Sequence, residues 1–261
     1  MQELSFQVQS IESVLSPNNL SGEGSLVDQT YQELRKNIIH LKLAPEQPLV
    51  EKDIATVFGI SKTPVREALI RLQKDKLVNV VPKSGSYVSP VSLERYFEAS
   101  FVRESLEVGC IKRLAEKGVT LVEEVKLRSI INQQKLLLDT DPDNYIDFFN
   151  EDEKLHKSFF EYAGIIGVWD LLNGAKAEID RVRHLKRMLK LDRKQQVYDE
   201  HSEIVEAVIR RDPEKAQELL RFHIDTIETK INGLAENPEF LESIEMINDI
   251  VKTQSKNKNR I

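Results

Sequence analysis

The chain has 261 residues, 40% of them hydrophobic, a formal net charge of −6 and a single cysteine, Cys110. This length and apolar content predict two domains with hydrophobic cores, and one cysteine, expected to be buried, excludes a disulfide framework. Because no apolar run is long enough to cross a bilayer and no secretion signal opens the chain, we expect a cytoplasmic protein with no membrane partner.

Residues 1–25 are rich in Ser, Gln, Asn and Gly, and we expect most of this segment to be a mobile arm. Apolar residues at helical spacing, between Glu3 and Leu15, allow one short helix within it.

The segment from Glu51 to Gln73 is typical of two short helices joined by a tight turn. Gly59 suits the left-handed turn, and Thr63 is placed to cap a second helix that begins at Pro64. The apolar residues at helical spacing are Ile54, Ala55 and Phe58 in the first helix and Val65, Ala68, Leu69 and Leu72 in the second. The pattern predicts a helical hairpin that buries one face of each helix.

Basic side chains at Lys62, Arg66 and Arg71 lie off the apolar stripe, as in a helix that reads the DNA major groove. Taken alone, the pattern also fits two ordinary packed helices with solvated charges. The following segment, Leu77 to Pro90, alternates like two short strands around a loop at residues 82–86. A helix, a turn, a helix and a hairpin together predict a winged helix-turn-helix.

The motifs ISKTPVREAL and SGSYV lie in the segment Leu26 to Val91, which closely resembles the N-terminal domain of the GntR family of bacterial transcription regulators. The resemblance implies that double-stranded operator DNA is a partner. The segment departs from the family pattern at Glu46 or Gln47 and at Lys76, where relatives often have Gly. The expected DNA contacts are Lys52, Lys62, Thr63, Arg66, Arg71, Lys83, Ser84 and Gly85.

The charge distribution is compatible with that partner. Residues 26–90 contain ten Lys and Arg against seven Asp and Glu, so this part carries +3 although the whole chain carries −6. DNA affinity depends on local positive charge, and a basic head on an acidic body fits a DNA-binding dimer.

Long amphipathic helices with short connections follow Pro90, and they predict an all-α bundle of about seven helices over residues 92–251. We expect this bundle to bind an effector and to form the dimer, and we expect residues 252–261 to be a flexible basic tail. The expected helices span approximately residues 92–117, 120–138, 141–164, 167–190, 193–211, 212–233 and 237–251.

Asp152 and His156 are four residues apart on one of these helices, and His201 and His223 fall on two others. If the helices bring them together, an Asp and three imidazoles suit a divalent ion such as zinc, nickel or manganese. Spacing alone leaves the alternative that each His is separately hydrogen-bonded or exposed.

The segments FVRESLEVGCIKRLAE, EDEKLHKSFF and DEHSEIVEAVIRRDPEKAQELLRFH resemble the FCD effector domain found in one GntR subfamily. The resemblance implies that Asp152, His156, His201 and His223 bind a metal ion, zinc first among them. It also implies that Arg103 contacts a ligand carboxylate, although Arg103 also suits a surface ion pair with Glu104 or Glu107. Arg183 is a further candidate for effector binding, with His184 beside it, and a solvated basic face is the alternative for both.

These features predict a mainly α, dimeric transcription regulator whose metal-containing helical domain senses a small organic acid. Two alternatives stay open on the sequence. One is a metal-dependent hydrolase fused to a DNA-binding head, and the other is a DNA-binding regulator whose metal is purely structural.

Overall fold

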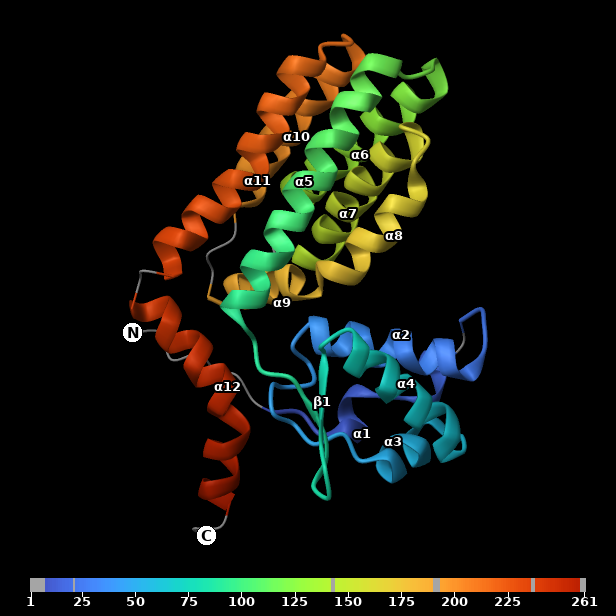
Figure 1. The fold of residues 1–261 in the computed structure, drawn as a ribbon, viewed down its shortest axis with the longest axis vertical. Helices are drawn as coiled ribbons and strands as arrows, with labels where there is room; N and C mark the ends of the chain where they lie inside the picture. Colours follow the sequence, from blue (N-terminus) through green and yellow to red (C-terminus); the bar gives the residue numbers. More distant parts are fainter. Residues whose placement is uncertain (1–7, 21, 142–143, 190–192, 236–237, 259–261) are drawn as a thin grey trace. The chain divides into compact units, whose positions relative to one another are not determined.

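The structure is a computed structural model that describes residues 8–20, 22–141, 144–189, 193–235 and 238–258 (Figure 1). The chain divides into two compact units. Unit 1 contains residues 1–96, 177–189 and 234–261, and unit 2 contains residues 97–176 and 190–233.

Unit 1 is built from short helices and one two-stranded hairpin. Its elements are α1 (Ile11–Val14), a 3-10 helix (Pro17–Leu20), α2 (Leu26–Ile39), α3 (Glu51–Phe58), α4 (Lys62–Lys74), β1 (Val78–Val81), β2 (Gly85–Val88), α9 (Ala177–Met188) and α12 (Pro238–Lys258). Residues 26–88 therefore form the expected winged helix-turn-helix, which we call the head.

The turn of the head forms where the sequence predicts it. Gly59 ends α3 in the left-handed conformation (φ 67°), and its N–H bonds the carbonyl groups of Ala55 and Thr56. Ser61, rather than the expected Thr63, is the N-cap of α4, because the helix already begins at Lys62. Buried side chains of both helices then fill the core of the head.

The wing is an antiparallel hairpin in which Val78 pairs with Val88 and Val81 pairs with Gly85. Its loop is residues 82–84, two residues shorter than the expected loop of 82–86, because Gly85 and Ser86 belong to β2. Lys83 has a φ of 62°. This left-handed residue and Gly85 (φ 131°) let the chain reverse within three residues.

Two further left-handed residues lie where the chain departs from the family pattern of Gly. Glu46 has a φ of 63° and Lys76 a φ of 60°, so the backbone turns there without a glycine. A residue with a side chain pays about 1 to 2 kcal/mol for this conformation, which the surrounding head structure must offset.

Part of the segment that we expected to be a mobile arm packs in the head. Ser10 caps the short helix α1, and Ile11 and Leu15 are buried in the core of the head with α3 residues. The earlier part of the expected helix, residues 3–7, lies outside the described residues. The apolar spacing that allowed a helix therefore also supplies core side chains.

The structure divides the helix expected over residues 167–190 into two. Unit 2 contains α8 (Ile166–Ala175), and α9 begins after a break at Lys176, whose side chain is buried. Within unit 1, α9 packs on α2, and Ala177 joins the core of the head. The described part of the chain after Pro90 thus holds eight helices, and the effector region predicted as residues 92–251 does not form one continuous unit. The last helix, α12, extends through Lys258 into the segment that we expected to be a flexible tail.

Two buried charged residues of α9 hold the segment Ser89 to Ser92, which follows the wing. The fully buried Arg181 donates from Nη2 to the carbonyl oxygen of Ser89 (2.7 Å) and from Nη1 to that of Pro90 (3.2 Å). Glu178 accepts a hydrogen bond from the backbone N–H of Ser92 (2.6 Å) and also pairs with Arg181 (3.3 Å). The polar backbone of this connection is therefore satisfied by side chains rather than by a sheet or a helix.

Asn248 of α12 holds the same connection. Its side chain accepts from the N–H of Val91 (2.8 Å) and donates to the carbonyl oxygen of Val91 (3.0 Å). Both backbone groups of Val91 are paired, as they would be beside a neighbouring strand.

Unit 2 is a helical bundle around one apolar core. Besides α8 it contains α6 (Leu121–Thr140), α7 (Tyr145–Tyr162) and α10 (Lys194–Ile209), together with most of α5 (Leu93–Lys117) and most of α11 (Pro213–Ala235). Within it, α6 packs on α7 and α10, and the core includes Cys110. Among the described helices, none is long and apolar enough to cross a membrane.

Candidate functional site

Four buried side chains of unit 2 meet in one cluster, which we call the metal centre. Asp152 and His156 lie one turn apart on α7, His201 lies on α10 and His223 on α11. One ligand atom from each residue lies within 4.8 Å of the others. The structure thus brings together all four residues that the sequence singled out as metal ligands.

A buried carboxylate orients His156. Nδ1 of His156 lies 2.5 Å from Oε2 of Glu107, whose other oxygen accepts a hydrogen bond from Nε of Arg103 (2.7 Å). Burial opposes ionisation of Glu107, but the charge of Arg103 and the hydrogen bonds from Arg103 and His156 hold the pKa of that carboxyl group below its usual value. An ionised carboxylate only accepts, so the proton of His156 is on Nδ1 and Nε2 keeps its lone pair.

Acceptors hold the other two imidazoles in the same way. Nδ1 of His223 lies 2.7 Å from Oε2 of Glu200, which also pairs with Arg193, and Nδ1 of His201 lies 3.1 Å from Oε1 of Gln134. Holding one ring nitrogen through a carboxylate or amide oxygen is the arrangement that prepares the other nitrogen for a metal ion.

The donor set fits a divalent metal ion. Nε2 of His201 is buried, makes no hydrogen bond with the described residues and lies 3.5 Å from Oδ1 of Asp152. Burial and the neighbouring His223 lower the pKa of His201, which favours the neutral, metal-binding imidazole. Neutral imidazoles and one carboxylate are suitable ligands for such an ion.

Arg103 reaches the metal centre. It is buried on α5, and its Nη2 lies 3.2 Å from Nε2 of His156. The ion pair with Glu107 forms as expected for one alternative, but it is buried rather than on the surface. The guanidinium group is therefore close enough to contact a molecule bound at the metal centre.

Arg183 and His184, the weaker candidates for effector binding, lie on α9 in unit 1 rather than in the bundle that forms the metal centre. The ring of His184 lies 4.4 Å from that of His40. Burial and the nearby His40 lower the pKa of His184 to about 3, so this histidine is neutral near pH 7.

Sequence reasoning missed the residues behind the ligands. The sequence pattern indicates Glu107 only as an ion-pair partner of Arg103, and it does not place Glu200 behind His223. Their spacing, four residues after Arg103 and one before His201, was an available signal. Gln134 gave no such signal in the sequence, because a single amide side chain on an amphipathic helix forms no distinctive pattern.

The expected DNA contacts divide into three groups. Lys52, Lys62, Thr63 and Arg66 are exposed on α3 and α4, and the guanidinium group of Arg66 makes two hydrogen bonds to Glu51 (2.9 and 2.8 Å). These four remain available at the surface of the head.

Arg71 is engaged elsewhere in the head. Its Nη1 lies 2.6 Å from Oδ1 of Asp28, and its guanidinium carbon lies 4.3 Å from the ring centre of Tyr31, both on α2. The structure therefore gives Arg71 a role in packing α4 against α2.

The tip of the wing is exposed at Lys83, Ser84 and Gly85. Oγ of Ser84 lies 2.7 Å from the hydroxyl oxygen of Tyr87, which links the loop to β2. A short exposed loop with a basic side chain is suited to contact the DNA backbone or the minor groove.

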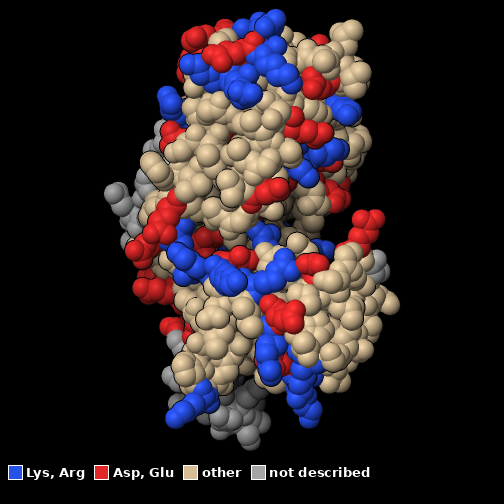
Figure 2. Space-filling model, turned by 45° about the vertical axis from the view of Figure 1, so that its right-hand side comes forward, with Lys and Arg blue, Asp and Glu red and all other residues tan. Residues whose placement is uncertain are grey.

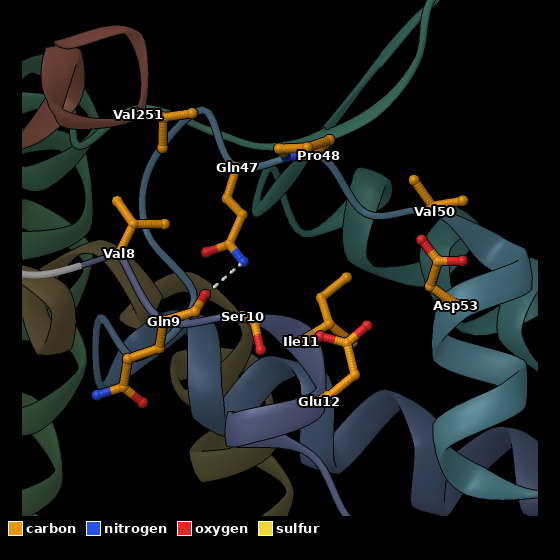
Figure 3. Close-up of a pocket in the computed structure, with 10 residues that line it drawn as sticks. All are labelled: Val8, Gln9, Ser10, Ile11, Glu12, Gln47, Pro48, Val50, Asp53 and Val251. Atoms are coloured by element: carbon orange, nitrogen blue, oxygen red, sulfur yellow. Dashed lines mark hydrogen bonds between the residues drawn. The ribbon is translucent and has the colours of Figure 1, made fainter. Parts of the chain in front are cut away.

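Unit 1 also contains a surface pocket of about 320 Å³, whose lining differs in composition from the metal centre (Figure 3). Its lining combines apolar side chains with Glu12 and Asp53, and Gln47 donates across it to the carbonyl oxygen of Gln9 (3.0 Å). None of the described residues that line it is a histidine or a basic residue, so these residues supply no positive charge for a carboxylate.

Comparison with known proteins places both parts of the chain. The model of bacterial regulatory proteins of the gntR family matches residues 26–88, and that of the FCD domain matches residues 98–226. The HTH-type transcriptional repressor RspR of Escherichia coli K12 is 29% identical over 206 residues, which cover 79% of this chain and 89% of that protein. An HTH-type transcriptional regulator in an unstable DNA locus of Streptomyces ambofaciens is 35% identical over 211 residues, which cover 80% of this chain and 86% of that protein. The chain belongs to the GntR family.

Solved structures of GntR regulators share the fold. E. coli McbR/YncC has a TM-score of 0.69 at 18% identity, covering 82% of this chain and 100% of that one. A GntR transcriptional regulator from Rhodococcus sp. RHA1 has a TM-score of 0.66 at 20% identity, covering 80% and 99%. With a GntR head and an FCD domain, this protein is a metabolite-responsive, DNA-binding transcription regulator. Both of the relatives from E. coli K12 and Streptomyces ambofaciens are named as transcription regulators.

Proposed function

We propose that this GntR regulator binds a divalent metal ion at the metal centre, with zinc as the first candidate and nickel or manganese as the others. The buried cluster of one Asp and three oriented imidazoles supports this proposal. Three neutral nitrogen ligands and one carboxylate suit zinc, and an ion held by four protein ligands can accept a further ligand. The ion would supply a fixed positive charge for an anionic effector.

The effector of this proposal is a small carboxylic acid that binds the metal ion and Arg103 together. The observation that carries it is the 3.2 Å distance between Nη2 of Arg103 and Nε2 of His156, which places the guanidinium group beside a ligand atom. The planar guanidinium fork matches a carboxylate, whereas a neutral sugar or an amine gains nothing from two adjacent positive groups.

The protein acts as a homodimer in the cytoplasm in this proposal. Two half-sites about one DNA turn apart need two heads related by symmetry. Unit 2 exposes large apolar side chains that a second copy can cover, among them Leu121 (81% exposed), Leu171 (72%) and Phe101 (71%). Figure 2 shows a broad area of unit 2 with few charged side chains. Effector binding would change operator affinity by favouring one arrangement of the heads.

A binding titration tests the effector class. Zinc-loaded protein is titrated with panels of small carboxylic acids, neutral sugars and amines while the melting temperature is followed. We expect stabilisation by an acid, and about tenfold weaker binding of that acid to Arg103→Lys, which keeps the charge but loses the fork. The exposed Lys112→Ala on the same helix serves as control. Stabilisation by sugars but by no acid would contradict this effector class, as would acid binding that survives both chelation and Arg103→Lys.

A second experiment tests the DNA contacts on an operator selected from random DNA. Arg66→Ala is expected to lower operator affinity by about 1 to 3 kcal/mol, because one good contact with a base carries that much. Arg71→Ala lies on the same helix but contacts α2, so it should leave affinity for the operator nearly unchanged. Wild-type affinity of the Arg66→Ala variant would show that α4 is assigned wrongly.

The two alternatives predict different results in these assays. A hydrolase fused to a DNA-binding head would turn over ester or amide substrates. A regulator with a purely structural metal would stay bound to its operator whichever small molecule is added. Acid-dependent operator release without turnover supports the proposal over both.

A further inference from the structure

The three imidazoles of the metal centre do not have equivalent partners. Glu107 and Glu200 are carboxylates and hold His156 and His223, whereas the wholly buried amide of Gln134 on α6 holds His201. A carboxylate can only accept a hydrogen bond from Nδ1. An amide has an oxygen that accepts and a nitrogen that donates, so it can pair with Nδ1 whether or not that nitrogen carries the ring proton.

The orientation of this amide decides which nitrogen of His201 carries the proton. With Oε1 toward Nδ1, as in the structure, the proton is on Nδ1 and Nε2 has a free lone pair. Nε2 of Gln134 and Nε2 of His201 are both buried without a hydrogen bond among the described residues. If the amide turns over, its nitrogen donates to Nδ1, and the ring proton moves to Nε2, 3.5 Å from Oδ1 of Asp152.

The two orientations therefore have opposite consequences. The second one gives both buried nitrogen atoms a partner, but it removes the lone pair that a metal ion needs. The first orientation leaves Nε2 of His201 ready for a metal ion, but Nε2 of Gln134 and Nε2 of His201 then have no hydrogen bond. This orientation is stable when a metal ion binds Nε2 of His201.

Gln134 also differs from Glu107 and Glu200 in charge. Among the described residues, the charged side chains that the contacts above place at the metal centre are Asp152, Glu107, Glu200, Arg103 and Arg193. These three carboxylates and two guanidinium groups, together with a divalent ion, leave one net positive charge. A carboxylate in place of the Gln134 amide would cancel this positive charge.

From this geometry we propose that Gln134 is a positioning residue of the metal centre, with two effects. Its amide oxygen prepares His201 to bind the metal ion, and its neutrality leaves the loaded centre positively charged toward a carboxylate. The inference rests on the metal centre of the proposed function.

Calorimetric titration of the metal-free protein with Zn²⁺ alone tests the first effect. Gln134→Leu should bind zinc about 10- to 100-fold more weakly than wild type, the usual cost of losing such a partner. Gln134→Glu should bind it at least as tightly, because a carboxylate also accepts from Nδ1. The control is Gln133→Leu, which replaces the exposed neighbour on α6 and should match wild type.

Titration of the Co²⁺-loaded protein with acetate tests the second effect, with the visible absorption of cobalt as the readout. Gln134→Glu should bind acetate at least about tenfold more weakly than wild type, because it adds a negative charge beside the centre. Circular dichroism verifies that each variant is folded.

The outcomes separate the inference from the proposed function. If wild type binds no zinc, the metal centre itself is refuted. If wild type binds zinc and folded Gln134→Leu binds it equally well, the positioning role is wrong. Should Gln134→Leu not fold, loss of zinc binding in folded Gln134→Glu overturns that role instead. Equal acetate affinity of wild type and Gln134→Glu overturns the role of the charge.

Discussion

His201→Ala is expected to abolish stoichiometric zinc binding and to lower the melting temperature measured with zinc present. An ion that binds only the folded protein stabilises it by linkage, by about 2.7 kcal/mol at a free concentration of 100 times Kd. Removing a wholly buried ligand removes that contribution. Metal analysis by mass spectrometry and thermal melts with and without zinc measure the two effects together.

The matched control is His40→Ala, which replaces a histidine of unit 1 that contacts His184. Its zinc content should equal that of wild type. Any stability that His40→Ala loses should be the same with and without zinc. Full zinc occupancy in a variant lacking the imidazoles of His156, His201 and His223 would disprove the metal centre.

Arg181→Ala is expected to lower the free energy of unfolding by about 3 to 5 kcal/mol. Its guanidinium group is fully buried and satisfies the carbonyl oxygens of Ser89 and Pro90, and its removal leaves Glu178 buried with less compensation. Breaking one side of a buried ion pair typically has this cost. Chemical denaturation followed by circular dichroism measures it.

Arg187→Ala is the control on the same helix, because Arg187 is exposed, and it should change stability by less than about 0.5 kcal/mol. Combining Arg181→Met with Glu178→Gln should recover part of the loss, since no unpaired charge then stays buried. A loss below about 1 kcal/mol in Arg181→Ala would mean that the connection after the wing is held by other contacts.

Local patterns in the sequence were enough to predict the winged helix-turn-helix and the helical bundle. Gly59 and the apolar stripe of α4 act through neighbours a few residues away, so spacing identifies them. The metal ligands needed the family resemblance in addition, because His201 and His223 are far from Asp152 in the chain and spacing alone does not bring three helices together.

The remaining features depend on tertiary contacts that no local pattern encodes. The break at Lys176 falls within a good helical pattern, and it allows α9 to pack on α2. Arg71 has the same chemistry as Arg66, and only its distance to Asp28 shows that it serves packing. The choice of Gln134 as the partner of His201 likewise depends on where two helices meet.

The assignment of α9 to unit 1 has a consequence for how this chain can be cut and recombined. The sequence passes between the two units four times, at residues 96–97, 176–177, 189–190 and 233–234. A fragment that stops at Val91 would contain the helix-turn-helix and the wing, but it would lack Ala177 in its core and the side chains of Arg181 and Asn248. We therefore expect that a chimera joined to a relative at the end of the wing loses these contacts, and that one carrying α9 and α12 from the same parent as its head keeps them.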